Sequence, residues 1–303
     1  MSLQGFDHLY ADASDLEEPV TVAAAGGDEA SVLEALRTAC DRGWVAPIVV
    51  GPETAIRDAA ERAEVELDGF RIVDAEGEAI GAAAVSEVTR GRARMLMKGQ
   101  IATPSLLRAV LDPEQGLRTG RVICQVVLME IARDNRRFLL ADTGITVRPK
   151  LEQKAEILQS TVDVARALAG ERPRVALMAA TESINVTMPE TLDAAELQKR
   201  NGAGEFLDCL VEGPLSFDLA YAADAADKKR VSGDVVGAAD AMVFPDLLSA
   251  NLTVKAIMYT ADCRFGGVLR GTSAPVVFMS RADSVATRLN SLALSLRILT
   301  RGG

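Results

Sequence analysis

The sequence predicts an α/β protein in which parallel or mixed sheets are flanked by helices. Short apolar runs alternate with longer segments of helical periodicity, which is the order typical of βαβ units. Aromatic residues make up 4% of the chain, whereas 49% of its residues are hydrophobic. A core built from alanine, valine and leucine suits parallel strands covered by helices better than an aromatic-rich sandwich.

In the first half of the chain, residues 1–19 are polar and acidic and are expected to form a helix or an arm. Strands are expected at residues 21–25, 47–50, 70–73 and 95–97, and helices at 29–42, 53–63, 78–90 and 105–111. The run Asp112-Pro113-Glu114-Gln115-Gly116 is the clearest break in this half.

In the second half, strands are expected at residues 122–128, 138–140, 175–179, 207–212, 241–244 and 275–278, and helices at 151–168, 190–200, 247–259 and 284–299. Gly266, Gly267 and Gly271 predict a flexible joint before the last strand. One strand and one helix cannot form a core alone, so we expect this pair to pack on the first domain. The predicted domains are therefore 1–115 together with 268–303, and 116–267.

Composition excludes several classes of protein. The net charge of -10 is opposite in sign to that of a general nucleic-acid or anionic-membrane binder. The 4 cysteines form no metal-type pair and are expected to be buried thiols, while the single histidine, His8, argues against histidine-based catalysis or a metal site. No run of 18 apolar residues and no signal peptide are found, so we expect a cytoplasmic protein with no membrane or nucleic-acid partner.

The tripeptide Met279-Ser280-Arg281 places a hydroxyl and a guanidinium at the end of an apolar strand and before a helix. Ligands bind at this edge of open α/β sheets. The planar fork of an arginine there favours a phosphate or a carboxylate, because it can donate two parallel hydrogen bonds. The alternative is an ordinary turn whose serine caps the helix and whose arginine is solvated.

Other polar residues occupy comparable positions. Lys98 ends a short buried strand and could bind an anion or extend to water, and Arg108 lies in the next helix. Asp218 lies near a helix N-terminus, where it could serve a site or cap the helix. Asn251 and Lys255 are four residues apart, so they share a helix face and could grip a phosphate or a carbonyl, or pair with neighbours on the helix surface.

Two further motifs are weaker. Gly26-Gly27-Asp28 follows the first strand and could let a ligand approach main-chain amides, but it is neither a Rossmann fingerprint nor a Walker loop. Asp142 also follows a strand, and a turn is the leading interpretation because no second carboxylate lies near it in sequence.

Taken in order, these segments resemble the phosphate acetyltransferase and phosphate butyryltransferase family. The resemblance spans roughly residues 20–300 and rests on Ala23-Ala24-Ala25 with Asp28, Leu96-Met97-Lys98-Gly99, Thr181-Glu182-Ser183-Ile184-Asn185, Glu212-Gly213-Pro214-Leu215-Ser216-Phe217-Asp218, Val243-Phe244-Pro245-Asp246 with Asn251 and Lys255, and Ser280-Arg281. The Gly-Pro-Leu segment and the residues after Ser280 look closer to the butyryl branch.

The resemblance implies two α/β domains, similar in fold to isocitrate and isopropylmalate dehydrogenases, with a cleft between them, usually in a homodimer. It implies reversible transfer of a short acyl group, acetyl or butyryl, between acyl phosphate and coenzyme A. Coenzyme A would be a co-substrate, and neither a metal nor a permanently bound cofactor is implied.

The resemblance also implies roles for individual residues. Ser280 would stabilise the tetrahedral intermediate through its hydroxyl or its amide, and Arg281 would bind the phosphate of the acyl phosphate. Arg108 is similar to a second phosphate-binding arginine of the family. Thr287 stands where the acetyl branch has a catalytic aspartate, and Asp283 lies in a different register, so no general base is carried over.

Two other functions are considered. A metal-dependent decarboxylating dehydrogenase would share the fold, but it would need clustered aspartates and a tyrosine-lysine pair that cannot be assembled from the 3 tyrosines. A non-catalytic or weakly catalytic sensor of coenzyme A or acyl phosphate is the alternative suggested by Thr287.

Overall fold

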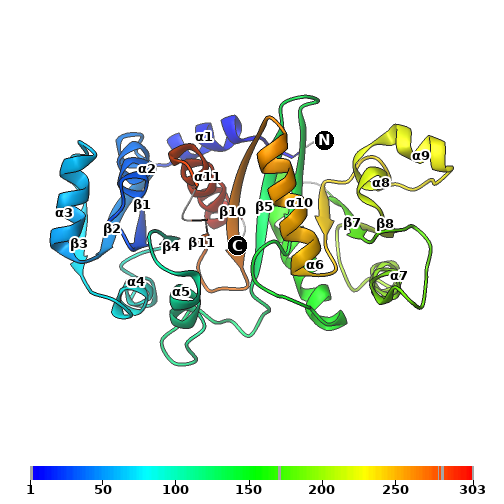
Figure 1. Ribbon diagram of the computed structural model, residues 1–303, viewed down its shortest axis with the longest axis horizontal. Coiled ribbons are helices and arrows are strands. Elements are labelled where there is room, and N and C mark those ends of the chain that lie inside the picture. Colours follow the sequence, from blue (N-terminus) through cyan, green and yellow to red (C-terminus); the bar gives the residue numbers. More distant parts are fainter. Residues whose placement is uncertain (1–2, 170–171, 279, 281–282, 302–303) are drawn as a thin grey trace. The chain divides into compact units, whose positions relative to one another are not determined.

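The computed structural model describes residues 3–169, 172–278, 280 and 283–301. Its contacts divide the chain into two compact units. The described residues of unit 1 are 3–5, 122–169 and 172–265, and those of unit 2 are 6–121, 266–278, 280 and 283–301. The start of the chain and its last helix, blue and red in Figure 1, therefore belong largely to the same unit.

Unit 2 is built on strands in the order β3, β2, β1, β4, β11 and β10. Their bounds are β1 (Val20–Ala25), β2 (Val45–Gly51), β3 (Arg71–Asp74), β4 (Met95–Lys98), β10 (Cys263–Arg270, of which 266–270 belong to unit 2) and β11 (Val276–Val277). All neighbours are parallel except β10 and β11. Ala25 lies beside Lys98 and Met97 beside Val277, so β1, β4 and β11 end at one edge.

Two groups of helices pack with these strands (Figure 1). One group comprises α1 (Phe6–Ser14), α2 (Ala30–Asp41) and α11 (Val285–Arg301), and the other α4 (Ala79–Thr89) and α5 (Thr103–Val110), while α3 (Glu53–Arg62) lies against β2 and β3. The sequence sets the start of α2, because the Glu29 carboxylate accepts a hydrogen bond from the Val32 amide. Most residues of α11 are buried, which explains its apolar periodicity.

The joint predicted at Gly266 and Gly267 is wrong, because both residues lie inside strand β10. A Cβ at Gly266 would come within 2.9 Å of the backbone of Asn290 and Ser291 in α11. The Gly267 amide also donates to Ser291 Oγ at 2.9 Å. These glycines therefore allow a helix to pack closely on a strand. Gly271 alone fits the predicted turn, with a φ of 84°.

Unit 1 has strands in the order β5, β6, β9, β7 and β8. Their bounds are β5 (Cys124–Ile131), β6 (Arg136–Ala141), β7 (Arg174–Met178), β8 (Leu210–Leu215) and β9 (Ala241–Val243). β5 and β6 form an antiparallel pair and the other neighbours are parallel. The helices of unit 1 are α6 (Leu151–Ala169), α7 (Pro189–Gly202), α8 (Phe217–Tyr221), α9 (Ala223–Lys229) and α10 (Leu247–Thr260).

Strand β8 continues through Gly213 and Pro214, beyond residue 212, where the predicted strand ends. The strand lies at the end of the strand order, and its pairing with β7 shifts by one residue between Glu212 and Leu215. A proline has no amide to donate, so it is tolerated at an edge and at such a bulge. The prediction failed because edge position is a property of the tertiary structure.

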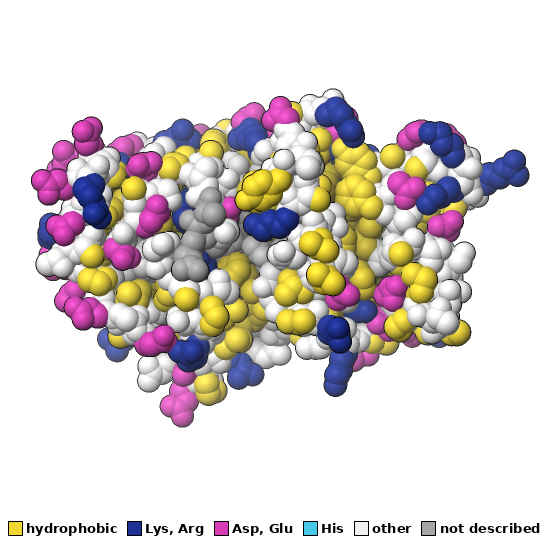
Figure 2. Space-filling model, in the orientation of Figure 1, with side chains coloured by type: hydrophobic (Ala, Val, Ile, Leu, Met, Phe, Trp, Pro, Cys, Tyr) yellow, Lys and Arg dark blue, Asp and Glu magenta, His cyan; other side chains and the backbone are white. Residues whose placement is uncertain are grey.

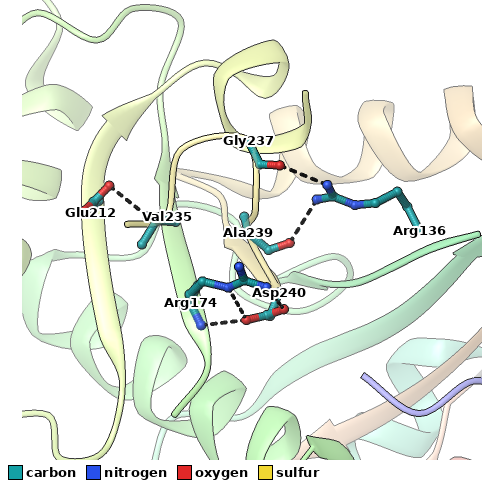
Figure 3. Close-up of polar contacts among 7 residues, drawn as sticks. All are labelled: Arg136, Arg174, Glu212, Val235, Gly237, Ala239 and Asp240. Atoms are coloured by element: carbon teal, nitrogen blue, oxygen red, sulfur yellow. Dashed lines mark hydrogen bonds and ion pairs between the residues drawn. The ribbon is translucent and has the colours of Figure 1, made fainter. Parts of the chain in front are cut away.

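Polar contacts hold the segment before β9 against its neighbouring strands (Figure 3). Asp240 Oδ2 accepts from the main-chain N and the Nε of Arg174, and Oδ1 accepts from its Nη2, over 2.9 to 3.0 Å. Arg136 donates to the carbonyls of Gly237 and Ala239 at 2.9 and 3.4 Å. The Glu212 carboxylate accepts from the Val235 amide at 3.2 Å. Charged groups on β6, β7 and β8 thus add polar contacts to a loop whose Val235 and Ala239 are buried in the hydrophobic core.

The predicted α/β class, with a mixed sheet flanked by helices, is confirmed. Most expected elements are present to within a few residues, and the first nineteen residues contain α1. Helix α9 and strand β10 were not predicted, and α8 was anticipated only as a helix start near Asp218. Among the described residues, no helix combines the length and apolar character that crossing a membrane requires.

Candidate functional site

The carboxyl edge of β1, β4 and β11 in unit 2 brings together two of the predicted site residues. Lys98 is the last residue of β4, and its side chain is buried. Its ammonium donates to the carbonyl of Gly99 at 3.4 Å. Ser280 follows β11 and is exposed at the same edge. This is the position at which parallel sheets bind ligands.

The loop that carries Ser280 is tied to Asp283. The Ser280 amide donates to Asp283 Oδ2 at 2.7 Å, and the Asp283 amide donates to the carbonyl of Ser280 at 3.2 Å. The amide of Ser280 is thus engaged in this structure. Arg281, the partner predicted for Ser280, lies outside the described residues.

Thr287 lies in the first turn of α11 and is buried. Its amide donates to Ser284 Oγ at 3.3 Å, and the two side-chain hydroxyls are 3.1 Å apart. This arrangement caps the helix start. An aliphatic hydroxyl is not a base near neutral pH, so Thr287 stabilises the start of α11 and offers no proton acceptor.

Arg288, the next residue along α11, was not predicted as a site residue. Its side chain is fully buried. The Nε donates to Ser31 Oγ at 3.1 Å, and Nη2 lies 3.8 Å from Glu29 Oε2. Burial lowers the pKa of this guanidinium, and the Glu29 carboxylate opposes that effect. A basic residue within an otherwise buried helix pattern was the only signal in the sequence.

The loop after β1 is shaped by its neighbour after β4. Gly26 has a φ of +81°, and a Cβ there would approach the backbone of Gln100 to 2.7 Å. The Gln100 amide donates to the Gly26 carbonyl at 2.7 Å. Close packing between two loops therefore explains this glycine. Asp28 Oδ1 is buried and has no hydrogen-bond partner in the part of the chain that the structure describes.

Arg108 is not brought to this edge by any contact in the structure. It lies in the last turn of α5, and its guanidinium pairs with the carboxylate of Glu78, which precedes α4. Both side chains are about 70% exposed. A surface ion pair accounts for the position of this arginine.

The remaining predicted residues belong to unit 1. Asp218 accepts from Ser216 Oγ at 2.6 Å and lies 2.9 Å from Lys229 Nζ. The Ser216 hydroxyl and the Lys229 ammonium hold the pKa of the Asp218 carboxyl below its usual range. The aspartate is in the first turn of α8, so its contacts are those of a carboxylate at a helix start.

Asn251 and Lys255 lie on α10, as the sequence predicts. Asn251 Nδ2 donates to the carbonyl of Thr143 at 3.3 Å, which links α10 to the turn after β6. In that turn the buried Asp142 accepts four main-chain N–H groups, from Gln125, Gly144, Ile145 and Thr146. The turn interpretation of Asp142 is therefore confirmed. Lys255 is half-buried.

A cavity of about 650 Å³ opens within unit 1 at the ends of β7 and β9. It is lined by apolar residues such as Phe244 and by the starts of α6, α7 and α10. Lys154 and Asp193 form an ion pair of 2.7 Å in its wall. Asp218, Asn251 and Lys255 do not line it. The sequence offered no sign of this cavity, because its walls come from segments far apart along the chain.

The described residues contain no cluster of three or more His, Cys, Asp or Glu side chains that could hold a metal ion.

Comparison with known proteins gives consistent matches. A family model described as phosphate acetyl/butaryl transferase matches residues 79–296. A phosphate butyryltransferase of Clostridium acetobutylicum is 40% identical over 280 residues, which cover 92% of this chain and 93% of that protein. A phosphate acetyltransferase of Thermotoga maritima is 37% identical over 276 residues, which cover 91% of this chain and 93% of that protein.

A solved structure is similar over nearly the whole chain. The branched-chain phosphotransacylase of Enterococcus faecalis superposes with a TM-score of 0.82 and 29% sequence identity, and the match covers 93% of this chain and 99% of that one. The sequence resemblance and the structural likeness therefore point to the same group of proteins.

Proposed function

Because this chain belongs to the phosphate acetyl/butaryl transferase family, we propose that it transfers a short acyl group reversibly between acyl phosphate and coenzyme A. The single observation that carries the proposal is the identity of 40% over 280 residues with a phosphate butyryltransferase. The edge formed by β1, β4 and β11 supports it, since a hydroxyl and a buried ammonium lie where an anionic substrate would bind.

In the forward reaction the sulfur of coenzyme A attacks the acyl carbon, and the bond from that carbon to the phosphate oxygen breaks. A thiol with a pKa near 8.5 is only a few per cent thiolate at neutral pH, so its proton must leave during the reaction. Neither Thr287 nor the engaged Asp283 offers a free base. We assign the proton to the departing phosphate, whose oxygens lie next to the reacting sulfur in any productive geometry.

The Ser280 hydroxyl is proposed to donate to the oxyanion of the tetrahedral intermediate, because the Ser280 amide is held by Asp283. Arg281 and Lys98 are proposed to bind the phosphoryl group. Substrate binding stays a prediction for Arg108, Asp218, Asn251 and Lys255. The contacts of the first three are explained by the fold. For Lys255, no contact among the described residues assigns a role.

The acyl group is proposed to be acetyl or butyryl. The identity to a butyryl enzyme, 40%, is close to that with an acetyl enzyme, 37%. One methylene changes binding by only about 1–3 kcal/mol, so several acyl phosphates should react at different rates.

The test is to mix the purified protein with coenzyme A and with acetyl, propionyl or butyryl phosphate, without added metal, and to follow thioester absorbance. Turnover establishes the reaction, and the ranking of kcat/KM identifies the acyl group. Absence of thioester in all three reactions, together with a metal-dependent oxidation of a hydroxy acid, would favour the dehydrogenase alternative. A folded protein that binds coenzyme A and turns over none of the three would favour the sensor.

The domain boundaries, the homodimer and the cellular location expected from the sequence and the resemblance are further proposals. We propose that unit 2 is the expected domain made of residues 1–115 and 268–303. Unit 1 is proposed to be the expected domain 116–267. A homodimer is supported by exposed apolar residues on one side of α10, namely Leu248, Leu252 and Tyr259. Hydrophobic side chains are visible around α10 in Figure 2, among charges of both signs. A cytoplasmic location stays a prediction.

A further inference from the structure

Arg288 is a fully buried arginine with two unsatisfied terminal nitrogens. Neither Nη1 nor Nη2 has a hydrogen-bond partner among the residues that the structure describes. Burial of a charged group is costly unless its hydrogen-bonding atoms are paired. Arg297 in the same helix provides a contrast, because its Nη1 donates to Asp12 Oδ2 at 2.6 Å. The same helix thus holds one satisfied and one unsatisfied buried arginine.

The nearest carboxylate does not satisfy Arg288. Glu29 Oε2 is 3.8 Å from Nη2, beyond hydrogen-bonding distance. This oxygen already accepts from Ser31 Oγ at 2.6 Å and from the Val32 amide at 3.1 Å, which caps α2. Glu29 is therefore committed to the start of α2 and leaves the guanidinium fork open.

The position of Arg288 is that of an anion site. Side chains on a helix lean toward its N-terminus, and Arg288 is in the first turn of α11. Its Nε reaches Ser31 at the start of α2, so the guanidinium lies where two helices begin. Main-chain N–H groups and the helix dipole favour anions at such ends. This is also the edge that carries Ser280 and Lys98.

We propose that Arg288 is a further substrate-binding residue, whose Nη1 and Nη2 donate to two oxygens of one phosphate group. The inference rests on the proposed function for the identity of the ligand. A phosphate suits this fork because its oxygens accept two parallel hydrogen bonds. The phosphate comes either from the acyl phosphate or from coenzyme A, and the experiment below separates these two sources.

Burial has a consequence for the way the phosphate binds. The terminal nitrogens are covered by protein, so a phosphate can reach them only if residues around the first turn of α11 move. Hydrogen bonds formed there are shielded from water and are correspondingly strong. Amide hydrogen exchange in residues 285–288 should therefore slow when phosphate is added.

The experiment compares Arg288→Met and Arg288→Lys with wild type by calorimetric titration with inorganic phosphate, coenzyme A and dephospho-coenzyme A. Loss of a bidentate contact should weaken phosphate binding about 10- to 100-fold in Arg288→Met. Arg288→Lys keeps the charge and loses the fork, so an intermediate loss is expected. The melting temperature of ligand-free Arg288→Met should not fall, because the variant removes an unsatisfied buried charge.

Arg297→Met is the matched control, since it removes a buried arginine of the same helix that has a partner. It should lower the melting temperature and leave the affinity for phosphate unchanged. If Arg288→Met and Arg288→Lys behave in the same way as this control, Arg288 is a structural residue and the inference is wrong.

The two phosphate sources give different results. Weaker binding of inorganic phosphate with normal coenzyme A binding assigns the phosphoryl group of the acyl phosphate. If the variants bind coenzyme A more weakly but bind inorganic phosphate and dephospho-coenzyme A normally, Arg288 binds the 3′-phosphate of coenzyme A. Both results support the inference. Because calorimetry needs no turnover, a protein without acyltransferase activity but with Arg288-dependent phosphate binding would refute the proposed function and keep this inference.

Discussion

The amide of Ser280 donates to the carboxylate of Asp283 over 2.7 Å, and the amide of Asp283 donates back to the carbonyl of Ser280. This reciprocal pair closes a turn between β11 and α11. The pair engages the carboxylate of Asp283, which is the carboxylate nearest to Ser280 in sequence. It also engages the Ser280 amide, which is one of the two groups that Ser280 could donate to an oxyanion. Asp283 is thereby a residue that positions Ser280.

The first prediction concerns this turn. Asp283→Ala should lower kcat about tenfold, because the Ser280 hydroxyl loses its fixed position, and a small misplacement of a reacting group is costly. Asp283→Asn should keep most of the activity, since its amide oxygen can accept the same hydrogen bond. Steady-state rates with acyl phosphate and coenzyme A test both variants.

The pH profile separates positioning from base catalysis at Asp283. A general base would lose its acid limb in Asp283→Asn, together with most of kcat. An Asp283→Asn enzyme as slow as Asp283→Ala would therefore contradict the positioning role.

The second prediction concerns the hydroxyl itself. Ser280→Ala should lower kcat about 10²- to 10³-fold, the usual effect of removing one oxyanion donor, while KM changes little. Ser280→Thr retains a hydroxyl and should keep part of the activity. A Ser280→Ala enzyme with the kcat of wild type would show that another group stabilises the intermediate.

The third prediction concerns Lys98, which is 2% exposed at the end of β4. Lys98→Met preserves the length of the side chain and removes its charge, so the KM for acyl phosphate should rise about tenfold. Circular dichroism and the melting temperature check that the fold is retained. An unchanged KM in a folded variant would mean that Lys98 has no part in binding.

The fourth prediction concerns the contacts drawn in Figure 3. Asp240 is 8% exposed and accepts three hydrogen bonds from Arg174. Asp240→Ala should lower the free energy of unfolding by about 3 kcal/mol, because it leaves a guanidinium and an amide unpaired. The exposed pair of Arg57 and Glu53 is the control, and Glu53→Ala should cost less than about 1 kcal/mol. Equal losses of unfolding free energy in the two variants, measured by urea denaturation, would contradict the expected difference between the buried and the exposed ion pair.

The fifth prediction is a pH dependence of stability in unit 2. Hydrogen bonds from Arg92, and then from Arg71, lower the pKa of the buried Glu87 carboxyl from 4.5 to about 2. A lowered pKa adds stability above the unfolded value, and this contribution is lost as the pH falls from 4.5 to about 2. We expect about 1 to 2 kcal/mol at neutral pH, since both arginines are partly exposed to solvent.

The matched variant for this carboxyl is Glu87→Gln. Its free energy of unfolding should be lower than that of wild type at pH 7, and the difference should shrink below pH 4.5. A difference that stays constant down to pH 2 would show that the charge of Glu87 does not supply the stability.

The local chemistry of the sequence determined most of the elements and part of the site. Alternating apolar runs and helical periodicity are short-range properties, so β1 to β4 and their helices were predicted. Lys98 and Ser280 were placed at one edge for the same reason, because each ends a parallel strand. Motif order also identified the family, which comparison of whole sequences bears out.

Tertiary structure alone decided the features that depend on distant neighbours. Gly266 lies inside a strand, where its missing Cβ lets α11 pack closely, and Pro214 is tolerated because β8 is an edge strand. The unsatisfied fork of Arg288 depends on Ser31 and Glu29, more than two hundred and fifty residues earlier in the chain. A sequence determines periodicity and the chemistry of each side chain, whereas burial and partners arise only when segments far apart pack together.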